Sequence, residues 1–333
     1  MNQRTHAWIA IRAAALLADE KECSGIVKLL KPFVRAAAAG AWLPDKGDAK
    51  IGGADTDNHV LKMEPYSGPQ QERFTLAKPE LLKKLGSERA MAAFLAADKV
   101  LSNEWWEAAY KADPKPGQHL ADRAGALATT ITDLLIMGDS DLANLLPRPF
   151  PFAEELDEKC RTSREQAAMY LFMQSHFIAD ACMPCHCDAR KLSSYANGLH
   201  KELESHWSTK IDSFFDEHRL AAATETPDAV LEKAKTVDKA FGITFKNEIP
   251  DLVEQDVWLE IIYICRGSFA VASIIAPPDQ YPYNSTARAP FDEVLKAKPE
   301  LMGEIDKVAL HDAVLNVAIT WKHMWKRLGA DQQ

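Results

Sequence analysis

The sequence predicts an all-α fold made of several helices in one domain. Apolar residues recur with the 3.6-residue period of helices over long segments that are rich in Ala, Leu, Lys and Glu. No segment has the alternating pattern of a half-buried strand set, and no β-hairpin turn sequence appears. The chain has 333 residues, 47% of them hydrophobic and 26% charged, which is an ordinary globular composition. We therefore expect a single multi-helix domain over residues 1–333.

Eight segments carry the helical pattern. In chain order they are 5–20, 25–39, 87–110, 117–138, 162–182, 196–218, 249–275 and 304–329. Thr5, Ser163 and Asn197 stand near the starts of three of them, and their short polar side chains suit the N-cap position. Pro184 should end or kink the fifth helix, because proline lacks the backbone N–H that a helix interior needs.

Three segments are expected to be irregular. Residues 40–58 are rich in Gly and Asp and should form no helix. Residues 146–153 are a Pro-rich connector, and residues 276–290 form a long loop that carries Tyr281 and Tyr283. Loops of this length in a compact domain are usually functional or mobile.

Charge and hydropathy argue against two broad classes of function. The net charge of -9 does not attract polyanions, so non-specific binding to duplex nucleic acid is not expected. No stretch approaches 18 uncharged apolar residues, so we predict no membrane span. Arg12 interrupts the first apolar run, which keeps helical spacing, so we interpret it as a helix of the fold. A secreted or periplasmic location follows if a signal peptide was removed, and a cytoplasmic one if Met1 is the native start.

The segment HFIADACMPCHCDAR, residues 176–190, allows three chemistries. Cys182 and Cys185 have the spacing of a thiol redox pair, and His186 extends the pattern to that of covalent haem attachment. The redox interpretation needs a βαβ context that the sequence lacks, and the haem interpretation leaves nearby histidines and carboxylates unexplained. Four alternatives stay open for Cys182, Cys185 and Cys187. They are buried thiols, a disulfide in an oxidising compartment, a local distortion of the metal site, or a thiolate that captures zinc.

The third interpretation is a metal site carried by two helices. His176 and Asp180 are four residues apart and share a helix face, and His186 follows just past the end of that helix. His200 and Glu204 repeat the four-residue spacing on the next helix. Imidazole and carboxylate ligands of this kind suit Zn²⁺ better than haem.

Further candidate ligands lie near the start of the chain. Asp45 and His59 lie in the Gly/Asp-rich segment, and His6 lies in the first helix. The other histidines have no such context, and we interpret them as structural: His119, His206, His218, His311 and His323.

These spacings resemble the bacterial zinc-dependent phospholipase C family and its relatives, the single-strand-specific fungal zinc nucleases. HFIADACMPCH resembles the family's His-x-x-x-Asp followed by Pro and His, and LHKELE resembles its second His-x-x-x-Glu. The family's loop Asp and His resemble Asp45 in WLPDKGD and His59 in the later pair Asn-His. Its opening helix resembles THAWIAIRAAALL, and its last helix resembles ITWKHMWKRLG. The metal motifs lie within residues 1–210, whereas 60–160 and 220–300 match nothing in the family.

The resemblance implies an all-α domain of phospholipase C type with a cleft for three zinc ions. A first zinc would have four ligands, namely Asp45, His59, His176 and Asp180. A second zinc would have three ligands, namely His186, His200 and Glu204. A third would be held by His6, by Asp180 as a bridging ligand, and by the backbone amine and carbonyl of Met1. The family's first residue is typically Trp, but backbone ligands require no particular side chain.

The activity implied is hydrolysis of a phosphodiester by a metal-activated water, with Asp45 orienting or deprotonating that water. A phospholipid would be the substrate, reached by transient contact with a membrane surface, and no obligate protein partner is expected. Glu204 and the interval from His186 to His200 resemble the phospholipase branch, but Lys46 and Thr56 replace two aromatic choline-binding residues. The alternatives are a zinc nuclease or nucleotidase for single strands and, from another class, a c-type haem electron carrier.

Overall fold

Helices make up nearly all of the regular structure in the computed structural model. It describes residues 1–50, 59–63, 119–137, 164–190, 192, 197–216, 219–220, 225–246, 248–252, 256–277, 280–282 and 288–328. The strands within these ranges are β1 (Phe215–Asp216) and β2 (Arg219–Leu220), which form one short antiparallel pair. The predicted all-α class is therefore confirmed, and the short strand pair is an addition to it.

The helices follow one another with short 3₁₀ segments between some of them. In order they are α1 (Gln3–Ala18), η1 (Lys21–Cys23), α2 (Ser24–Leu30), η2 (Lys31–Ala36), α3 (Ala37–Lys50), α8 (Leu120–Met137), α11 (Arg164–Ala181), α12 (Pro184–Cys187), α13 (Leu199–Ile211), η5 (Asp212–Phe214), α14 (Pro227–Thr236), α15 (Asp238–Phe241), α16 (Val257–Ile275), η6 (Asp292–Lys296) and α17 (Pro299–Arg327). The η6 segment is a single π-helical turn.

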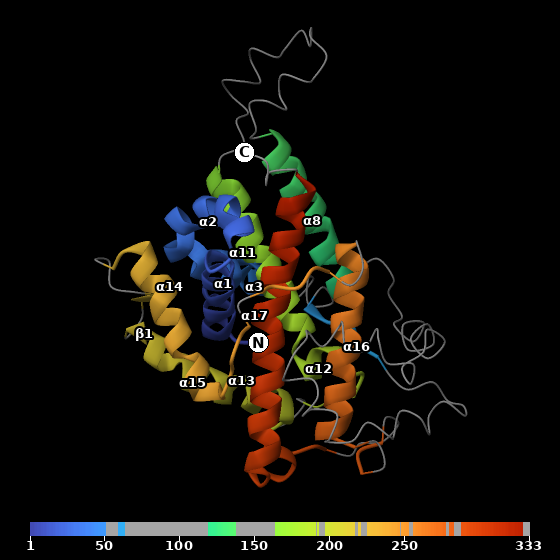
Figure 1. Ribbon diagram of the computed structural model, residues 1–333. Helices are drawn as coiled ribbons and strands as arrows, with labels where there is room; N and C mark the ends of the chain where they lie inside the picture. Colours follow the sequence, from blue (N-terminus) through green and yellow to red (C-terminus); the bar gives the residue numbers. More distant parts are fainter. Residues whose placement is uncertain are drawn as a thin grey trace, which may run out of the picture.

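α1 is the central helix of the bundle. All residues from 5 to 17 are buried, including the charged Arg12, so α1 meets protein on every side. It packs against α3, α11, α14 and α17, and α11 packs in turn against α3, α8 and α17 (Figure 1). Residue 1 also lies inside the bundle, since Met1 is buried. The start of the chain is thereby brought next to α11.

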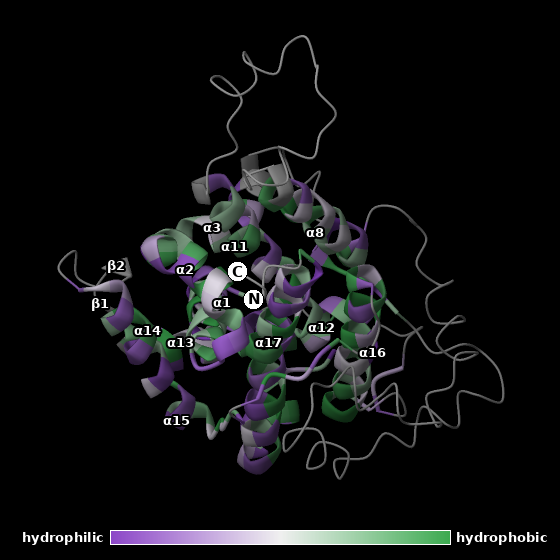
Figure 2. Cartoon of the chain, turned by 45° about the horizontal axis from the view of Figure 1, so that its top comes forward, coloured by the Kyte–Doolittle hydropathy of each residue, from purple (hydrophilic) through white to green (hydrophobic). Residues whose placement is uncertain are grey.

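Among the helices that the structure describes, α16 is the most apolar. By length and composition Val257–Ile275 is able to cross a membrane, but 83% of its hydrophobic window is buried inside the protein. It packs against α8 and α12. Figure 2 shows its hydrophobic colouring in contrast to the hydrophilic residues of the outer helices α14 and α15. Burial in the protein core accounts for the apolar composition of α16.

The N-caps differ from those predicted. Asn2 caps α1, because its Oδ1 accepts a hydrogen bond from the backbone N–H of Thr5 at 3.2 Å. Thr5 already lies within the first turn. Gly198 holds the N-cap position of α13, and Asn197 before it has a left-handed backbone with φ 64°. Ser163 and the predicted helix 87–110 lie outside the described residues, as does the connector 146–153.

The prediction that 40–58 forms no helix is wrong for its first part, because α3 continues to Lys50 with Pro44 inside it. The cause is a close contact between helices. A Cβ atom on Gly40 would stand 2.5 Å from Cβ of Phe172, so the bare glycine lets α3 lie directly on α11. Residues 51–58 lie outside the described part of the chain. The loop expected at 276–290 begins where α16 ends, although Tyr283 is not among the described residues.

Candidate metal centre

Asp180 lies at the middle of a cluster of histidines and carboxylates. Its side chain is 1% exposed. Its Oδ1 lies 2.8 Å from the backbone nitrogen of Met1 and 3.3 Å from His6 Nε2. Its Oδ2 lies 3.1 Å from His59 Nδ1 and 3.2 Å from His176 Nε2. The two oxygens therefore face different sets of potential ligands, which is the arrangement of a carboxylate that bridges two metal ions.

The first set contains the four residues predicted for one metal ion. His59 Nδ1 and His176 Nε2 are 3.0 Å apart, and Asp180 Oδ2 completes a triangle with them. Asp45 Oδ1 lies further out, 3.6 Å from His176 Nε2 and 4.0 Å from His59 Nδ1. A tetrahedral zinc ion with bonds of about 2.0–2.1 Å keeps its ligand atoms roughly 3.3 Å apart. The spacing of this set suits such an ion.

The second set joins α12 to α13. His200 Nε2 lies 2.9 Å from His186 Nε2 and 2.9 Å from Glu204 Oε1. The remaining side of the triangle, from His186 Nε2 to Glu204 Oε1, is 3.7 Å. These three atoms again have the spacing of ligands around one ion. His200 and Glu204 meet because they are one helical turn apart, as the sequence predicts.

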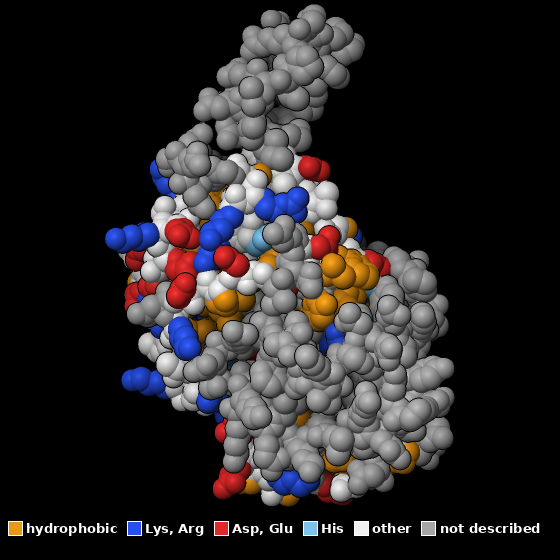
Figure 3. Space-filling model, turned by 45° about the vertical axis from the view of Figure 1, so that its right-hand side comes forward, with side chains coloured by type: hydrophobic (Ala, Val, Ile, Leu, Met, Phe, Trp, Pro, Cys, Tyr) orange, Lys and Arg blue, Asp and Glu red, His pale blue; other side chains and the backbone are white. Residues whose placement is uncertain are grey.

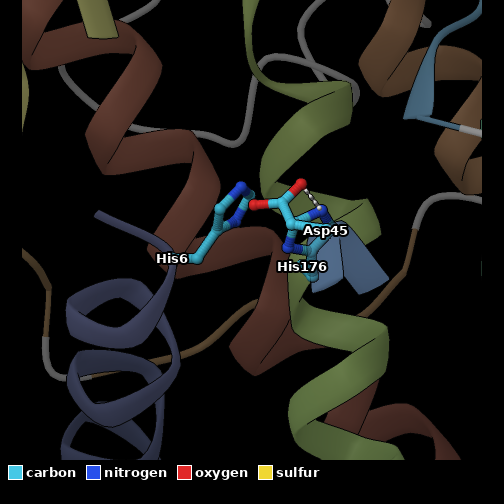
Figure 4. A group of neighbouring side chains, drawn as sticks. All are labelled: His6, Asp45 and His176. Carbon is cyan, nitrogen blue, oxygen red and sulfur yellow. Dashed lines mark ion pairs between the residues drawn. The ribbon is translucent and has the colours of Figure 1, made fainter. Parts of the chain in front are cut away.

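The third set surrounds His6 on α1. The imidazole of His6 stacks on that of His176 with ring centroids 3.7 Å apart. Figure 4 shows the carboxylate of Asp45 pointing at both rings, and these three residues form a group able to hold a metal ion. The N-terminal ammonium of Met1 forms ion pairs with Asp180 Oδ1 at 2.8 Å and with Glu204 Oε1 at 3.0 Å. Burial is outweighed by the neighbouring carboxylates, which raise the pKa of this amine to about 11, so the predicted third site would require it to lose its proton. Asp45 and His176 both lie in this group and in the first set, a sharing that was not predicted.

Several histidine nitrogens at the cluster are buried without a hydrogen-bond partner. They are both ring nitrogens of His6, Nε2 of His59 and Nδ1 of His186. Burying a polar nitrogen without a partner is unfavourable by about 1–3 kcal/mol. Ligation of a metal ion by one ring nitrogen of His6 would remove part of this penalty. The donors are imidazoles and carboxylates, which suit zinc, so the residues present fit the metal.

Backbone contacts orient the first set. His176 Nδ1–H donates to the carbonyl of Ala41 at 2.7 Å, which leaves Nε2 free to bind a metal. His59 begins a short extended segment that pairs with the residues around α12. In this pairing the N–H of Leu61 donates a hydrogen bond to the carbonyl of His186 at 3.2 Å. The Ala41 contact was not predicted, since a backbone carbonyl has no signature in the sequence.

The charges of the cluster stabilise its ionised carboxylates. Burial disfavours ionisation of Asp180, but the N-terminal amine and His186 outweigh it and hold the pKa of this carboxyl well below its usual range. At Glu204 burial is outweighed by the N-terminal amine and by the hydrogen bonds with His186 and His200, so the pKa of this carboxyl is also well below the ordinary value. Burial lowers the pKa of His6 and of His200, which favours their neutral forms. At His59 burial is outweighed by the hydrogen bond to Asp180, which raises the pKa and favours the protonated form. Ionised carboxylates and neutral imidazoles are the forms that bind metal ions.

The cysteines of the CMPC sequence are buried in the core. Cys182, Cys185 and Cys187 are free thiols within the described ranges, and none of the potential metal groups there includes them. Burial raises the pKa of Cys182 and of Cys185 far above that of an ordinary thiol. Since the thiolate is the reactive form, these cysteines are poor candidates for redox chemistry. Of the alternatives left open by the sequence, the structure has buried thiols.

Histidines outside the cluster have structural contacts, as predicted. His206 Nε2 lies 2.8 Å from the buried carboxylate of Asp306, and His311 stacks on Phe245 with centroids 4.9 Å apart. His119 Nε2 lies 3.5 Å from Asp122 Oδ2. His218 lies outside the described residues.

Comparison with known proteins gives no family for this chain. No family model, curated protein or solved structure matches it. Function is therefore inferred from the three groups of His, Asp and Glu that are able to hold metal ions.

Proposed function

We propose that the protein is a zinc-dependent phosphodiesterase of the phospholipase C type. The proposal is carried by one observation, which is that both oxygens of the buried Asp180 face potential metal ligands from separate segments of the chain. A carboxylate in an ordinary structural salt bridge needs one cationic partner, whereas Asp180 has potential metal ligands on both of its oxygens. The resemblance of the metal motifs to the phospholipase C family supports the same function.

The zinc ligands are assigned by the three sets. Asp45, His59, His176 and Asp180 would hold one ion, and His186, His200 and Glu204 would hold another. His6, Asp180 and the backbone of Met1 would hold the third. Bound zinc would supply Lewis acidity, which lowers the pKa of water towards neutrality and offsets the negative charge of a phosphodiester.

Asp45 is the proposed catalytic carboxylate. Its side chain is 36% exposed, compared with 1% for Asp180, so water and substrate can approach it. Its Oδ1 remains only 3.6 Å from His176 Nε2 at the edge of the cluster. Asp45 is therefore placed to accept a hydrogen bond, and then a proton, from a water that attacks phosphorus. Asp180 keeps its charge inside the protein and holds the ligand sets together.

A single-strand nuclease is the second candidate. Lys46 and Thr56 stand where the phospholipases carry aromatic choline-binding residues. Lys46 is exposed and follows Asp45 directly, so it is able to meet a phosphate group. On the face shown in Figure 3, acidic and basic side chains are interspersed over the described surface. Together with the net charge of -9, this favours a lipid substrate over an extended polyanion.

The haem interpretation has little support from the geometry. Covalent attachment would require both CMPC thiols to reach one haem, but Cys182 and Cys185 are only 1% and 2% exposed. His186 faces His200 and Asp180. We expect purified protein to show no Soret absorption band.

The proposed function is tested by comparing substrates on the zinc-loaded protein. Vesicles of phosphatidylcholine and of phosphatidylethanolamine should release phosphorylated head groups, while single-stranded DNA should be cut much more slowly. Asp45→Asn should lose most of the turnover, because Asn preserves the shape of the side chain without a basic oxygen. It should also bind the first zinc more weakly, because an amide oxygen is a weaker ligand than a carboxylate oxygen, while His186, His200 and Glu204 keep theirs. Cleavage of DNA alone would favour the nuclease, and full activity of Asp45→Asn would refute the role of that carboxylate.

A further inference from the structure

A buried ion pair lies directly after the second set of ligands and takes no part in the chemistry described above. Arg190 Nη2 lies 2.6 Å from Asp188 Oδ2, and Arg190 Nε donates to Asp188 Oδ1 at 2.9 Å. The two side chains are 5% and 0% exposed. The backbone N–H of Arg190 also donates to Asp188 Oδ1 at 2.8 Å. This forked contact fixes the chain between residues 188 and 190 in one conformation.

The same guanidinium holds this segment to the end of α16. Arg190 Nη1 donates to the carbonyls of Ala276 and Tyr281, the latter at 2.9 Å. Arg190 Nη2 also reaches the carbonyl of Ala272 at 3.5 Å. A cation at the last carbonyls of a helix is favoured by the helix dipole. One side chain thereby joins the segment after His186 to the helix end and to the loop that follows it.

The segment fixed by Arg190 also holds the other metal set. Met63 N–H donates to the carbonyl of Cys187 at 3.0 Å, and Ala189 N–H donates to the carbonyl of Met63 at 2.8 Å. Met63 and Asp188 form a parallel β-bridge. The short segment 59–63, which begins with His59, is thus paired to residues 186–189. His59 and His186 therefore belong to one backbone unit, although they lie in different ligand sets.

We propose that Arg190 and Asp188 are positioning residues that set the distance between the two zinc sets through His59 and His186. The inference rests on the proposed function, since it assigns a role within the same zinc cluster. Neither side chain ligates a metal or touches the reacting atoms. Together they hold the backbone unit from which both histidines project.

The chain contains a matched control. Arg12 and Asp238 form another forked pair, which is partly buried, with Nε to Oδ1 at 3.0 Å and Nη2 to Oδ2 at 2.8 Å. Their side chains are 5% and 14% exposed. This pair joins α1 to α15 and belongs to none of the metal groups in the described residues. Substitution of Arg12 or Asp238 should lower the free energy of unfolding about as much as substitution of Arg190 or Asp188, without moving His59 or His186.

The test measures cobalt(II) binding to metal-free protein by calorimetry and by the visible spectrum of the bound ion. Arg190→Lys keeps the charge but cannot form the fork, and Asp188→Asn keeps the size but loses the charge. Each should weaken cobalt binding by roughly 10- to 100-fold, as for other groups that orient metal ligands, and should alter the cobalt spectrum. Arg12→Lys and Asp238→Asn should bind cobalt as the unchanged protein does. The metal-free stability of all four variants is measured alongside by urea unfolding.

The outcomes separate the two claims. Wild-type affinity and spectrum in a folded Arg190→Lys or Asp188→Asn variant would overturn the positioning role and leave the proposed function intact. An equal loss of cobalt affinity in the control pair would also overturn it, because the effect would then follow stability alone. If Arg190→Lys does not fold, Asp188→Asn decides by the same criteria. A wild-type protein that binds neither cobalt nor zinc would overturn the proposed function, and the inference with it.

Discussion

At the scale of single residues, the central feature is that the two oxygens of the buried Asp180 face potential metal ligands from separate segments of the chain. The sequence predicts that His176 and Asp180 share a helix face, and the resemblance of the motifs implies that Asp180 bridges two metal ions. It does not predict the supporting contacts. The carbonyl of Ala41 that orients His176 belongs to a residue without distinctive chemistry, and it becomes visible only when α3 is packed against α11.

Asp180→Asn should release at least two zinc ions and abolish nearly all activity. An amide oxygen is a weaker ligand than a carboxylate oxygen, and the amide nitrogen cannot ligate on the opposite side. We expect turnover to fall by at least about 100-fold, with zinc content measured on the same sample. Asp238→Asn is the control for loss of a buried carboxylate. An Asp180→Asn variant with three zinc ions and full activity would refute the bridging role.

Replacing both Cys182 and Cys185 by Ser should leave activity and zinc content largely unchanged. The thiols are buried in the core and lie outside the metal groups of the described residues. Stability should fall by about 1–3 kcal/mol, because two hydroxyls are buried in place of two thiols. Zinc content and urea unfolding measure the two effects. An inactive protein that has lost its zinc would mean that a thiolate is a ligand.

At the scale of elements, the helical segments follow from periodicity, while their exact limits depend on contacts between distant parts of the chain. The glycine and proline of residues 40–50 favour a loop locally, yet α3 is helical through them because Gly40 fits against Phe172. His59 is likewise placed by pairing of residues 59–63 with residues 186–189, which no local pattern encodes. Tertiary packing overrides local propensity at both places.

Gly40→Ala should disturb the metal centre from a distance. The new Cβ would stand 2.5 Å from Cβ of Phe172, so α3 must shift and carry Asp45 with it. We expect a loss of about 1–3 kcal/mol in the free energy of unfolding, together with reduced turnover. Gly303→Ala is the matched control, because no atom lies within 4 Å of its added Cβ, and it should be neutral or slightly stabilising. Unchanged activity and stability of Gly40→Ala would contradict the close packing of α3 on α11.

At the scale of the whole molecule, metal ligation should link distant segments of the chain into one stable unit. The potential ligands come from α1, α3, α11, α12, α13 and the segment at His59. The resemblance of the motifs predicts which residues converge. The head-group preference is not predicted, because it depends on side chains that line the approach to the zinc ions and have no comparable spacing pattern.

Removal of metal should lower the thermal stability of the protein. A single ion present at 100 times its Kd adds about 2.7 kcal/mol to the folded state, so chelation should lower Tm by several degrees. Differential scanning calorimetry before and after chelation measures the change. Adding zinc should restore Tm, whereas adding magnesium should not, because imidazole ligands bind zinc in preference to magnesium. A Tm that is insensitive to the chelator would mean that the cluster holds no metal in solution.

The most direct test of the zinc cluster is elemental analysis of the protein purified without chelators. We predict three zinc ions per chain, one for each ligand set of the proposed function. Asp180→Asn measured beside it should contain fewer. Protein that contains no zinc, or that contains iron in its place, would contradict the account and return the CMPCH sequence to the haem interpretation.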